Sequence, residues 1–289
     1  MQQQEWQERA QRHADRTRPW IDDRLARRAE GRTHAVNDFL FEYYPFSPTK
    51  LATWHPGHGV VLEGPAARAF LRHPSYVVVH EGVTTDDGAL QKHRARLDLA
   101  IRLLRGTTSR PAVTGCFGLH EWAMVYGQEQ EEVRHSRLPL RVSPRTVIAT
   151  VDDVGLRCTH IDAYRFFTPS AVPLNPLEPT RATQPDLEQP GCLHASMDLY
   201  KYAFWLSPFV SSDLIADCFE NALRARELDM RASPYDVSEF GLAPITVETP
   251  EGRRHYAHEQ RDLMDRTAPL RARLLDVLER LSESASIET

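Results

Sequence analysis

The chain has 289 residues, of which 41% are hydrophobic and 26% charged, a composition typical of a globular protein with a substantial core. Its formal charge of −5 argues against a protein that binds mainly by neutralising nucleic-acid phosphates, although a local basic patch would still allow such binding. No apolar run approaches the ~20 residues that a membrane-spanning helix needs, and the N-terminus has no apolar signal segment. We therefore expect a cytoplasmic protein with no membrane partner.

The N-terminal residues 1–34 are rich in arginine and are predicted to form a helical arm that breaks or restarts at Pro19. Glutamates and aspartates in the same segment offset much of its positive charge. An exposed helix with internal ion pairs and an arm that contacts nucleic acid are both compatible with this pattern.

Residues 36–59 are rich in aromatic side chains, among them Trp54. This composition is typical of a core cluster beneath an irregular loop. The alternative is a surface on which nucleic-acid bases stack.

Apolar and β-branched patterns predict the remaining elements. Strands are expected over 60–62, 76–80, 156–167 and 244–249. Helices are expected over 90–104, 143–153, 211–228 and 254–281. The expected fold is a helix-rich α+β protein, a single compact domain with a few short strands and an N-terminal helical arm.

Three segments follow from this pattern. They are the arginine-rich helical arm over residues 1–34, an α+β catalytic or binding domain over 35–281, and a loose tail over 282–289.

The same order of groups, Cys-x-His followed by Asp, occurs twice. The first set is Cys158, His160 and Asp162, and the second is Cys192, His194 and Asp198. Alternate residues of a strand share a face, so the first set is predicted to project together. The four cysteines of the chain lie far apart, which in a cytoplasmic protein favours free thiols or metal ligands over disulfides.

The sequence does not identify a cofactor. Imidazole and thiolate groups suit zinc or iron, so our working interpretation is a site for one of these metals. The candidate ligands are His120, His160 and His194, and Glu121 lies beside them as a base. Asp162 and Asp198 are placed to orient the ligating histidines.

A second ligand set would form a closed structural zinc site. It consists of Cys158, His160, Cys192 and His194. Buried histidines and cysteines that are satisfied by hydrogen bonds would give the same sequence pattern, so their role as ligands or core residues stays open.

A metal-free site is also chemically reasonable. Glu121, Asp162 and Asp198 supply the carboxylates that hydrolysis of a glycosidic bond requires. Arg165 follows Asp162 closely and would either bind an anionic substrate group or form a structural ion pair. The phosphate-binding, dinucleotide-binding and serine-hydrolase motifs are absent.

Several stretches resemble an actinobacterial family whose members are catalogued as 3-methyladenine DNA glycosylase. They include H-P-G-H-G-V-V-L-E-G, L-R-C-T-H-I-D-A-Y-R-F-F-T-P, E-Q-P-G-C-L-H-A-S-M-D-L-Y-K-Y-A and E-L-D-M-R-A-S-P-Y-D. The motifs of established alkyl-base glycosylases are absent, so the resemblance carries over no catalytic residue.

The resemblance implies a hydrolase of the N-glycosidase type that acts on a modified purine, either in DNA or in a purine-containing small molecule. Such an enzyme would take the base into a pocket and stack it on aromatic side chains, for which Trp54, Tyr164 and Tyr200 are the candidates. Arginines between residues 9 and 32 would contact phosphate. Two alternatives remain, a metal-dependent enzyme acting on a small molecule at His120, His160 and His194, and a non-catalytic binding module. The sequence does not determine the oligomeric state.

Overall fold

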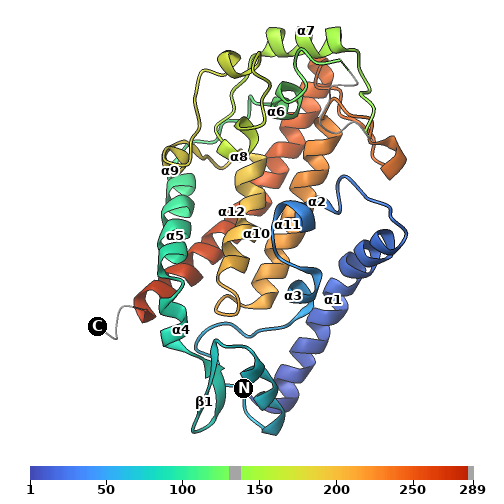
Figure 1. Ribbon diagram of the computed structural model, residues 1–289. Coiled ribbons are helices and arrows are strands. Elements are labelled where there is room, and N and C mark those ends of the chain that lie inside the picture. Colours follow the sequence, from blue (N-terminus) through green and yellow to red (C-terminus); the bar gives the residue numbers. More distant parts are fainter. Residues whose placement is uncertain (130–137, 286–289) are drawn as a thin grey trace. The chain divides into compact units, whose positions relative to one another are not determined.

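The computed structural model describes residues 1–129 and 138–285. The fold is helix-rich with few strands, as predicted, and the described residues contain a single two-stranded sheet (Figure 1). None of the described helices is both long and apolar enough to cross a membrane.

The chain divides into two compact units. The first comprises Met1–Leu104, Asp198–Ala222 and Leu270–Thr289, and the second comprises Arg105–Met197 and Leu223–Pro269. Four helices contribute residues to both units, namely α5 (Arg94–Ser109), α10 (Leu193–Trp205), α11 (Ser212–Ala232) and α12 (Pro250–Ser284).

The first unit begins with one long helix and continues with shorter elements. They are α1 (Gln3–Ala29), α2 (Phe39–Tyr43), α3 (Pro48–Ala52), the 3-10 helix η1 (Pro65–Arg72), β1 (Tyr76–Val79), β2 (Gly82–Thr85) and α4 (Asp87–Gln91). The arginine-rich segment predicted as an arm forms α1, which belongs to this unit and packs against α3.

The predicted break at Pro19 is wrong, because α1 is continuous through it. Residues on both sides of the proline, Trp6, His13, Thr17 and Ile21, are buried along the helix. Their burial anchors the helix before and after Pro19, and this offsets the roughly 3 kcal/mol that an interior proline costs.

The sheet is a hairpin in which Tyr76 lies opposite Thr85. The predicted strand over 76–80 is confirmed as β1, and the segment over 60–62 contributes only an isolated bridge from Leu62 to Val83. Tyr76, Leu62 and Val83 pack with Trp6 and Trp54 in one apolar cluster.

The predicted strands over 156–167 and 244–249 are wrong. The first segment contains the short helix α8 (Ile161–Tyr164), and the second is irregular with Ile245 and Val247 buried. In both segments apolar side chains, Leu156 and Phe167 in the first and Ile245 and Val247 in the second, contact the core without a neighbouring strand to pair with.

The second unit contains further short elements besides its parts of the four shared helices. They are α6 (Leu119–Ala123), α7 (Pro144–Val154), α8, the 3-10 helices η3 (Val172–Leu174) and η4 (Ser238–Phe240), and α9 (Gln184–Leu187). Helix α7 begins as predicted, since the Ser143 hydroxyl accepts a hydrogen bond from Thr146 N at 3.2 Å.

Predicted helices over 90–104, 211–228 and 254–281 are confirmed as α5, α11 and α12. Helix α12 continues to Ser284, so it includes the start of the segment predicted as a loose tail. Residues 286–289 of that tail lie outside the described residues.

Candidate functional site

A left-handed turn positions α6 in the second unit. Phe117 has a φ of 45° and Gly118 a φ of 70°, both in the region that favours glycine. A Cβ atom on Gly118 would lie 3.3 Å from the Cβ atom of Ala232. The turn therefore brings α6 directly against α11, and it places His120 and Glu121 at the buried start of α6.

Four charged residues form a buried chain in this unit, which we call the ion-pair cluster. His120 Nε2 lies 2.7 Å from Asp229 Oδ1. Arg226 Nη1 donates to Asp229 Oδ2 and to Glu121 Oε1, both at 2.8 Å. None of the four side chains is more than 9% exposed. With His120 protonated, their charges sum to zero.

Electrostatics favours the charged forms within the ion-pair cluster. Burial lowers the pKa of His120, but attraction to Asp229 and Glu121 outweighs it and leaves that pKa above its usual value. Burial raises the pKa of Asp229, but His120 and Arg226 bring it far below the usual range. His120 and Asp229 therefore form an imidazolium–carboxylate pair.

The ion-pair cluster has the donor set of a metal site. One ligand atom each of His120, Glu121 and Asp229 lies within 4.8 Å of the others. Nitrogen and carboxylate donors suit zinc or iron. However, Arg226 already donates to both carboxylates, so a metal ion would compete with its guanidinium group.

The three predicted metal ligands lie next to one another. The ring centroids of His120 and His194 are 4.8 Å apart, and those of His160 and His194 are 5.4 Å apart. The structure therefore brings together the three histidines that the sequence pattern singled out, all in the second unit.

His160 uses both of its ring nitrogens. Its Nδ1 accepts a hydrogen bond from Asp162 N at 3.2 Å, which starts α8, and its Nε2 lies 2.8 Å from Glu188 Oε1. Because Nδ1 accepts, a neutral ring carries its proton on Nε2, the nitrogen that lies near the Glu188 carboxylate. A metal ion would have to displace one of these two partners. The predicted strand arrangement, with Cys158, His160 and Asp162 on one face, is replaced by this helix start.

Three cysteines line a cavity of about 20 Å³ together with His120 and His194. The cavity has room for about one water molecule. Burial raises the pKa of Cys158 to about 12 and also raises those of Cys116 and Cys192. All three thiols are free and are protonated at neutral pH.

The predicted carboxylates Asp162 and Asp198 have other partners. Asp162 pairs with Arg181 and lies 3.4 Å from Arg165, so the Asp162–Arg165 ion pair foreseen as the alternative is present. Asp198 belongs to the first unit, where it accepts a hydrogen bond from Tyr44 at 2.8 Å and pairs with Lys201.

Two predicted stacking residues are packed among other rings. Tyr200 is fully buried, and its ring lies 5.1 Å from those of Phe204 and Phe219. Tyr164 packs against Phe167 at 5.2 Å. The third, Trp54, lines a large pocket in the first unit.

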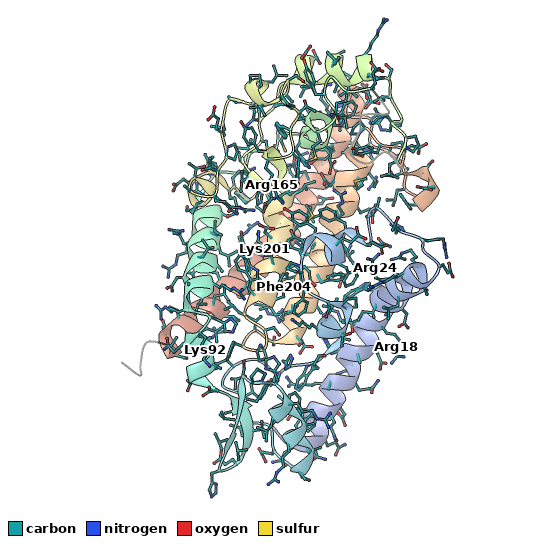
Figure 2. The ribbon with its side chains drawn as sticks, in the orientation of Figure 1. Arg18, Arg24, Lys92, Arg165, Lys201 and Phe204 are labelled. Carbon is teal, nitrogen blue, oxygen red and sulfur yellow. The ribbon has the colours of Figure 1, made fainter. Side chains whose placement is uncertain are left out.

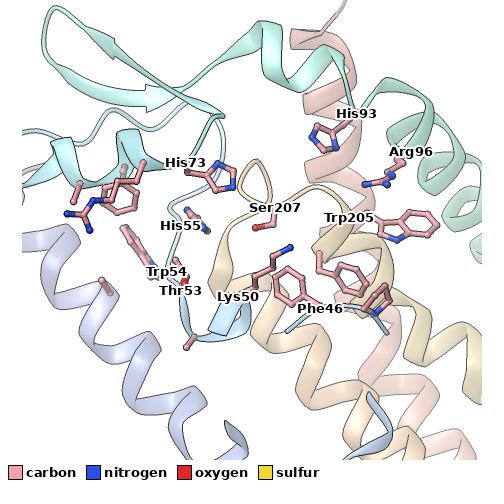
Figure 3. Close-up of a pocket in the computed structure, with 17 residues that line it drawn as sticks. Phe46, Lys50, Thr53, Trp54, His55, His73, His93, Arg96, Trp205 and Ser207 are labelled. Carbon is pink, nitrogen blue, oxygen red and sulfur yellow. The ribbon is translucent and has the colours of Figure 1, made fainter. Parts of the chain in front are cut away.

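The first unit contains a pocket of about 780 Å³, which we call the first-unit pocket (Figure 3). Its aromatic wall includes Phe46, Trp54, Phe70, Phe204 and Trp205. Pockets of this size and apolar character are typical sites for small organic ligands.

The first-unit pocket also carries positive charge. Lys50, Arg72 and Arg96 line it, and none of its 17 lining residues is an aspartate or glutamate. Within residues 1–129 and 138–285, these three cations form no ion pair with a carboxylate. An anionic ligand would therefore meet positive charge and no negative charge on this wall.

Three histidines add groups that titrate near neutrality. The pKa of His93 is lowered by burial and by the neighbouring Arg96. That of His73 is lowered mainly by burial and further by Lys50 and His93. Burial lowers the pKa of His55 to about 4, and its Nδ1 lies 3.0 Å from the Tyr76 hydroxyl. All three imidazoles are therefore neutral at pH 7 without a bound anion.

The arginines of α1 are largely paired. Arg16 lies 2.7 Å from Asp217 and 3.0 Å from Glu220. Arg24, labelled in Figure 2, lies 2.7 Å from Asp38. Further pairs within α1 and the segment after it join Arg9 to Glu5, Arg12 to Glu8, Arg18 to Asp15, Arg27 to Asp38 and Arg32 to Glu30. Much of the positive charge expected to contact phosphate is therefore neutralised within the protein.

The sequence pattern did not indicate which residues contact the histidines, nor which cations line the first-unit pocket. For the ion-pair cluster one local signal exists, because Arg226 and Asp229 are three residues apart on α11, the spacing of a helical ion pair. Glu188 and the pocket cations carry no local signal, because their neighbours come from separate segments.

Comparison of the chain with models of known protein families, with curated proteins and with solved structures finds no match.

Proposed function

We propose that this protein binds a planar, negatively charged small molecule in the first-unit pocket. The observation that carries the proposal is the lining itself, in which five aromatic rings and three cations occur without a carboxylate. Aromatic faces stabilise a planar ring by stacking, and arginine and lysine stabilise phosphate or carboxylate groups. A neutral or cationic ligand would leave the cations of the wall uncompensated.

The resemblance adds a reaction to this binding site, N-glycosidase hydrolysis of a modified purine. A purine nucleotide combines the planar ring and the anionic group that the pocket favours. The predicted catalytic carboxylates do not line this pocket, and the groups there that can accept a proton from water are the neutral imidazoles of His55, His73 and His93. A reaction in the pocket would therefore use histidine as the general base.

The pocket favours a small molecule over DNA as the ligand. Its cations lie around a concave cavity, whereas the arginines of α1, which would have to follow a phosphate backbone, are largely paired with acids. The formal charge of −5 adds a repulsion that a polyanion feels more strongly than a mononucleotide.

Binding is tested with adenosine 5′-monophosphate and its N-methylated analogues. Trp54 and Trp205 line the pocket, so ligand binding should change the tryptophan emission and give a saturable titration. The double variant Lys50→Gln/Arg96→Gln should bind at least about tenfold more weakly, since each charge-assisted contact contributes roughly 1.5–3 kcal/mol.

The matched control removes two positive charges elsewhere. Arg18 and Arg254 are exposed and do not line the pocket, so Arg18→Gln/Arg254→Gln should leave affinity unchanged. No saturable binding of any nucleotide, or equal loss in both double variants, would contradict the proposal. Release of free base from bound nucleotide separates an enzyme from a non-catalytic binding module.

A second candidate function is metal-dependent chemistry in the second unit. It is favoured by the three ligand atoms of His120, Glu121 and Asp229 within 4.8 Å, and disfavoured by Arg226 between the two carboxylates. The test is the metal content of protein purified without a histidine tag. Near-stoichiometric zinc or iron that is lost in His120→Ala, but kept in the exposed-site variant His258→Ala, would support it.

A further inference from the structure

The first-unit pocket has two aromatic ends. One end is formed by Trp54 and Phe70, whose ring centroids are 6.4 Å apart, and the other by Trp205 beside the stacked pair of Phe46 and Phe204. In Figure 3, Trp54 lies on one side of the pocket and Trp205 on the other. The pocket therefore offers two separate apolar surfaces.

Each aromatic end combines one half-buried ring with a buried ring. Phe70 and Trp205 are half-buried, whereas Trp54 and Phe46 are 5% and 6% exposed. A half-buried ring held by buried neighbours keeps a face available for stacking without a large loss of side-chain entropy.

Positive and titratable groups lie between the two ends. Figure 3 shows Lys50 and Ser207 between Trp54 and Trp205. Lys50 interacts electrostatically with His73, which also interacts with His93. Basic and titratable side chains therefore lie between the aromatic ends.

We infer that the ligand of this pocket carries two planar ring systems joined by an anionic linker, the shape of a dinucleotide. This inference rests on the proposed function. A single nucleotide would occupy one aromatic end and leave the other exposed to water, which forfeits the burial that the second end offers. The volume of about 780 Å³ lies toward the upper end of the range of about 300–1,000 Å³ that ligand pockets cover.

The test compares two anionic probes, one with two adenosines and one with a single adenosine. Diadenosine 5′,5‴-diphosphate has two adenines and an anionic linker, and adenosine 5′-monophosphate has one adenine. The two-ring probe should bind at least about fivefold more tightly, because stacking of one more base contributes roughly 1–3 kcal/mol, equivalent to about a 5- to 150-fold difference.

Ring variants assign the two ends. Phe70→Leu and Trp205→Leu keep apolar bulk but remove the aromatic face, so both should fold. Each should weaken binding of the two-ring probe by about fivefold or more, whereas only one of them should weaken binding of the monophosphate. Val78→Ala is the control, because Val78 is 66% exposed and does not line the pocket.

The outcomes separate this inference from the proposed function. Equal affinity for the two probes, with both affinities lost in Lys50→Gln/Arg96→Gln, would overturn the two-ring inference and keep the anion site. Failure of both probes to bind would overturn both proposals.

Discussion

His120 on α6 and Asp229 on α11 form an imidazolium–carboxylate pair, with 2.7 Å between His120 Nε2 and Asp229 Oδ1. The carboxylate partner of this histidine thus comes from a distant helix and not from the Asp residues that follow the Cys-x-His segments. Arg226 and Glu121 complete the ion-pair cluster.

Removing the negative charge of Asp229 should destabilise the protein strongly. Asp229→Asn keeps the shape but leaves the charges of His120 and Arg226 without their shared anion, and breaking a buried ion pair costs about 3–5 kcal/mol. Urea unfolding measures the change in the free energy of unfolding. Asp153→Asn, at a carboxylate that is 72% exposed, should cost less than about 0.5 kcal/mol. A cost below about 1 kcal/mol for Asp229→Asn would contradict the described cluster.

His55 should make the folded state acid-sensitive. Its pKa is about 4 in the folded state and about 6.5 when unfolded, so its stabilising effect is complete above pH 6.5 and is lost as the pH falls toward 4. The loss amounts to at most about 3 kcal/mol. His55→Gln should flatten the fall of the unfolding free energy over this range. An unchanged slope in the variant would mean that another group causes the acid sensitivity.

The pH dependence of the stability contributed by His120 is opposite to that of His55. Its pKa is raised in the folded state, so its contribution is present below the unfolded pKa of about 6.5 and is lost as the pH rises through the folded pKa. Proton titration of His120 by NMR should therefore give a midpoint above the ordinary histidine value of about 6.5. In Asp229→Asn the midpoint should fall, because burial then dominates. A His120 midpoint that Asp229→Asn leaves unchanged is the contrary result.

Anion binding in the first-unit pocket should take up protons. His73 and His93 have lowered pKa values near Lys50 and Arg96, and a bound anion would raise both. Affinity for diadenosine diphosphate, whose linker does not titrate here, should rise as the pH falls from 8 to 6. The double variant His73→Gln/His93→Gln should bind with the same affinity across this range. His55 is the third histidine of the lining, and His55→Gln shows whether it contributes.

Gly118→Ala should be costlier than Gly241→Ala. Both glycines are in the left-handed region, with φ values of 70° and 73°, so both substitutions introduce about 1 kcal/mol of backbone strain. Only at Gly118 would the new Cβ meet Ala232 at 3.3 Å, whereas nothing lies within 4 Å at Gly241. Thermal unfolding should therefore show the larger loss for Gly118→Ala, and equal losses would mean that the α6–α11 contact relaxes.

Local patterns predicted much of the secondary structure. The long helices α5, α11 and α12 follow from the helical spacing of apolar residues, and the cap of α7 follows from Ser143-Pro144. The strand predicted over 156–167 was wrong because its apolar residues instead pack against the core around the short helix α8. Pro19 did not end α1 because burial of residues on both sides outweighs its lost hydrogen bond.

The sequence by itself predicted a helix-rich chain and grouped His120, His160 and His194 as candidate metal ligands, since both follow from residue types at short spacing. Tertiary structure alone decided which carboxylates these histidines contact, Asp229 and Glu188, and that distant aromatic and basic residues share one pocket. The physical reason is that side-chain partners are set by how separate segments pack, and short-range periodicity carries no information about that packing.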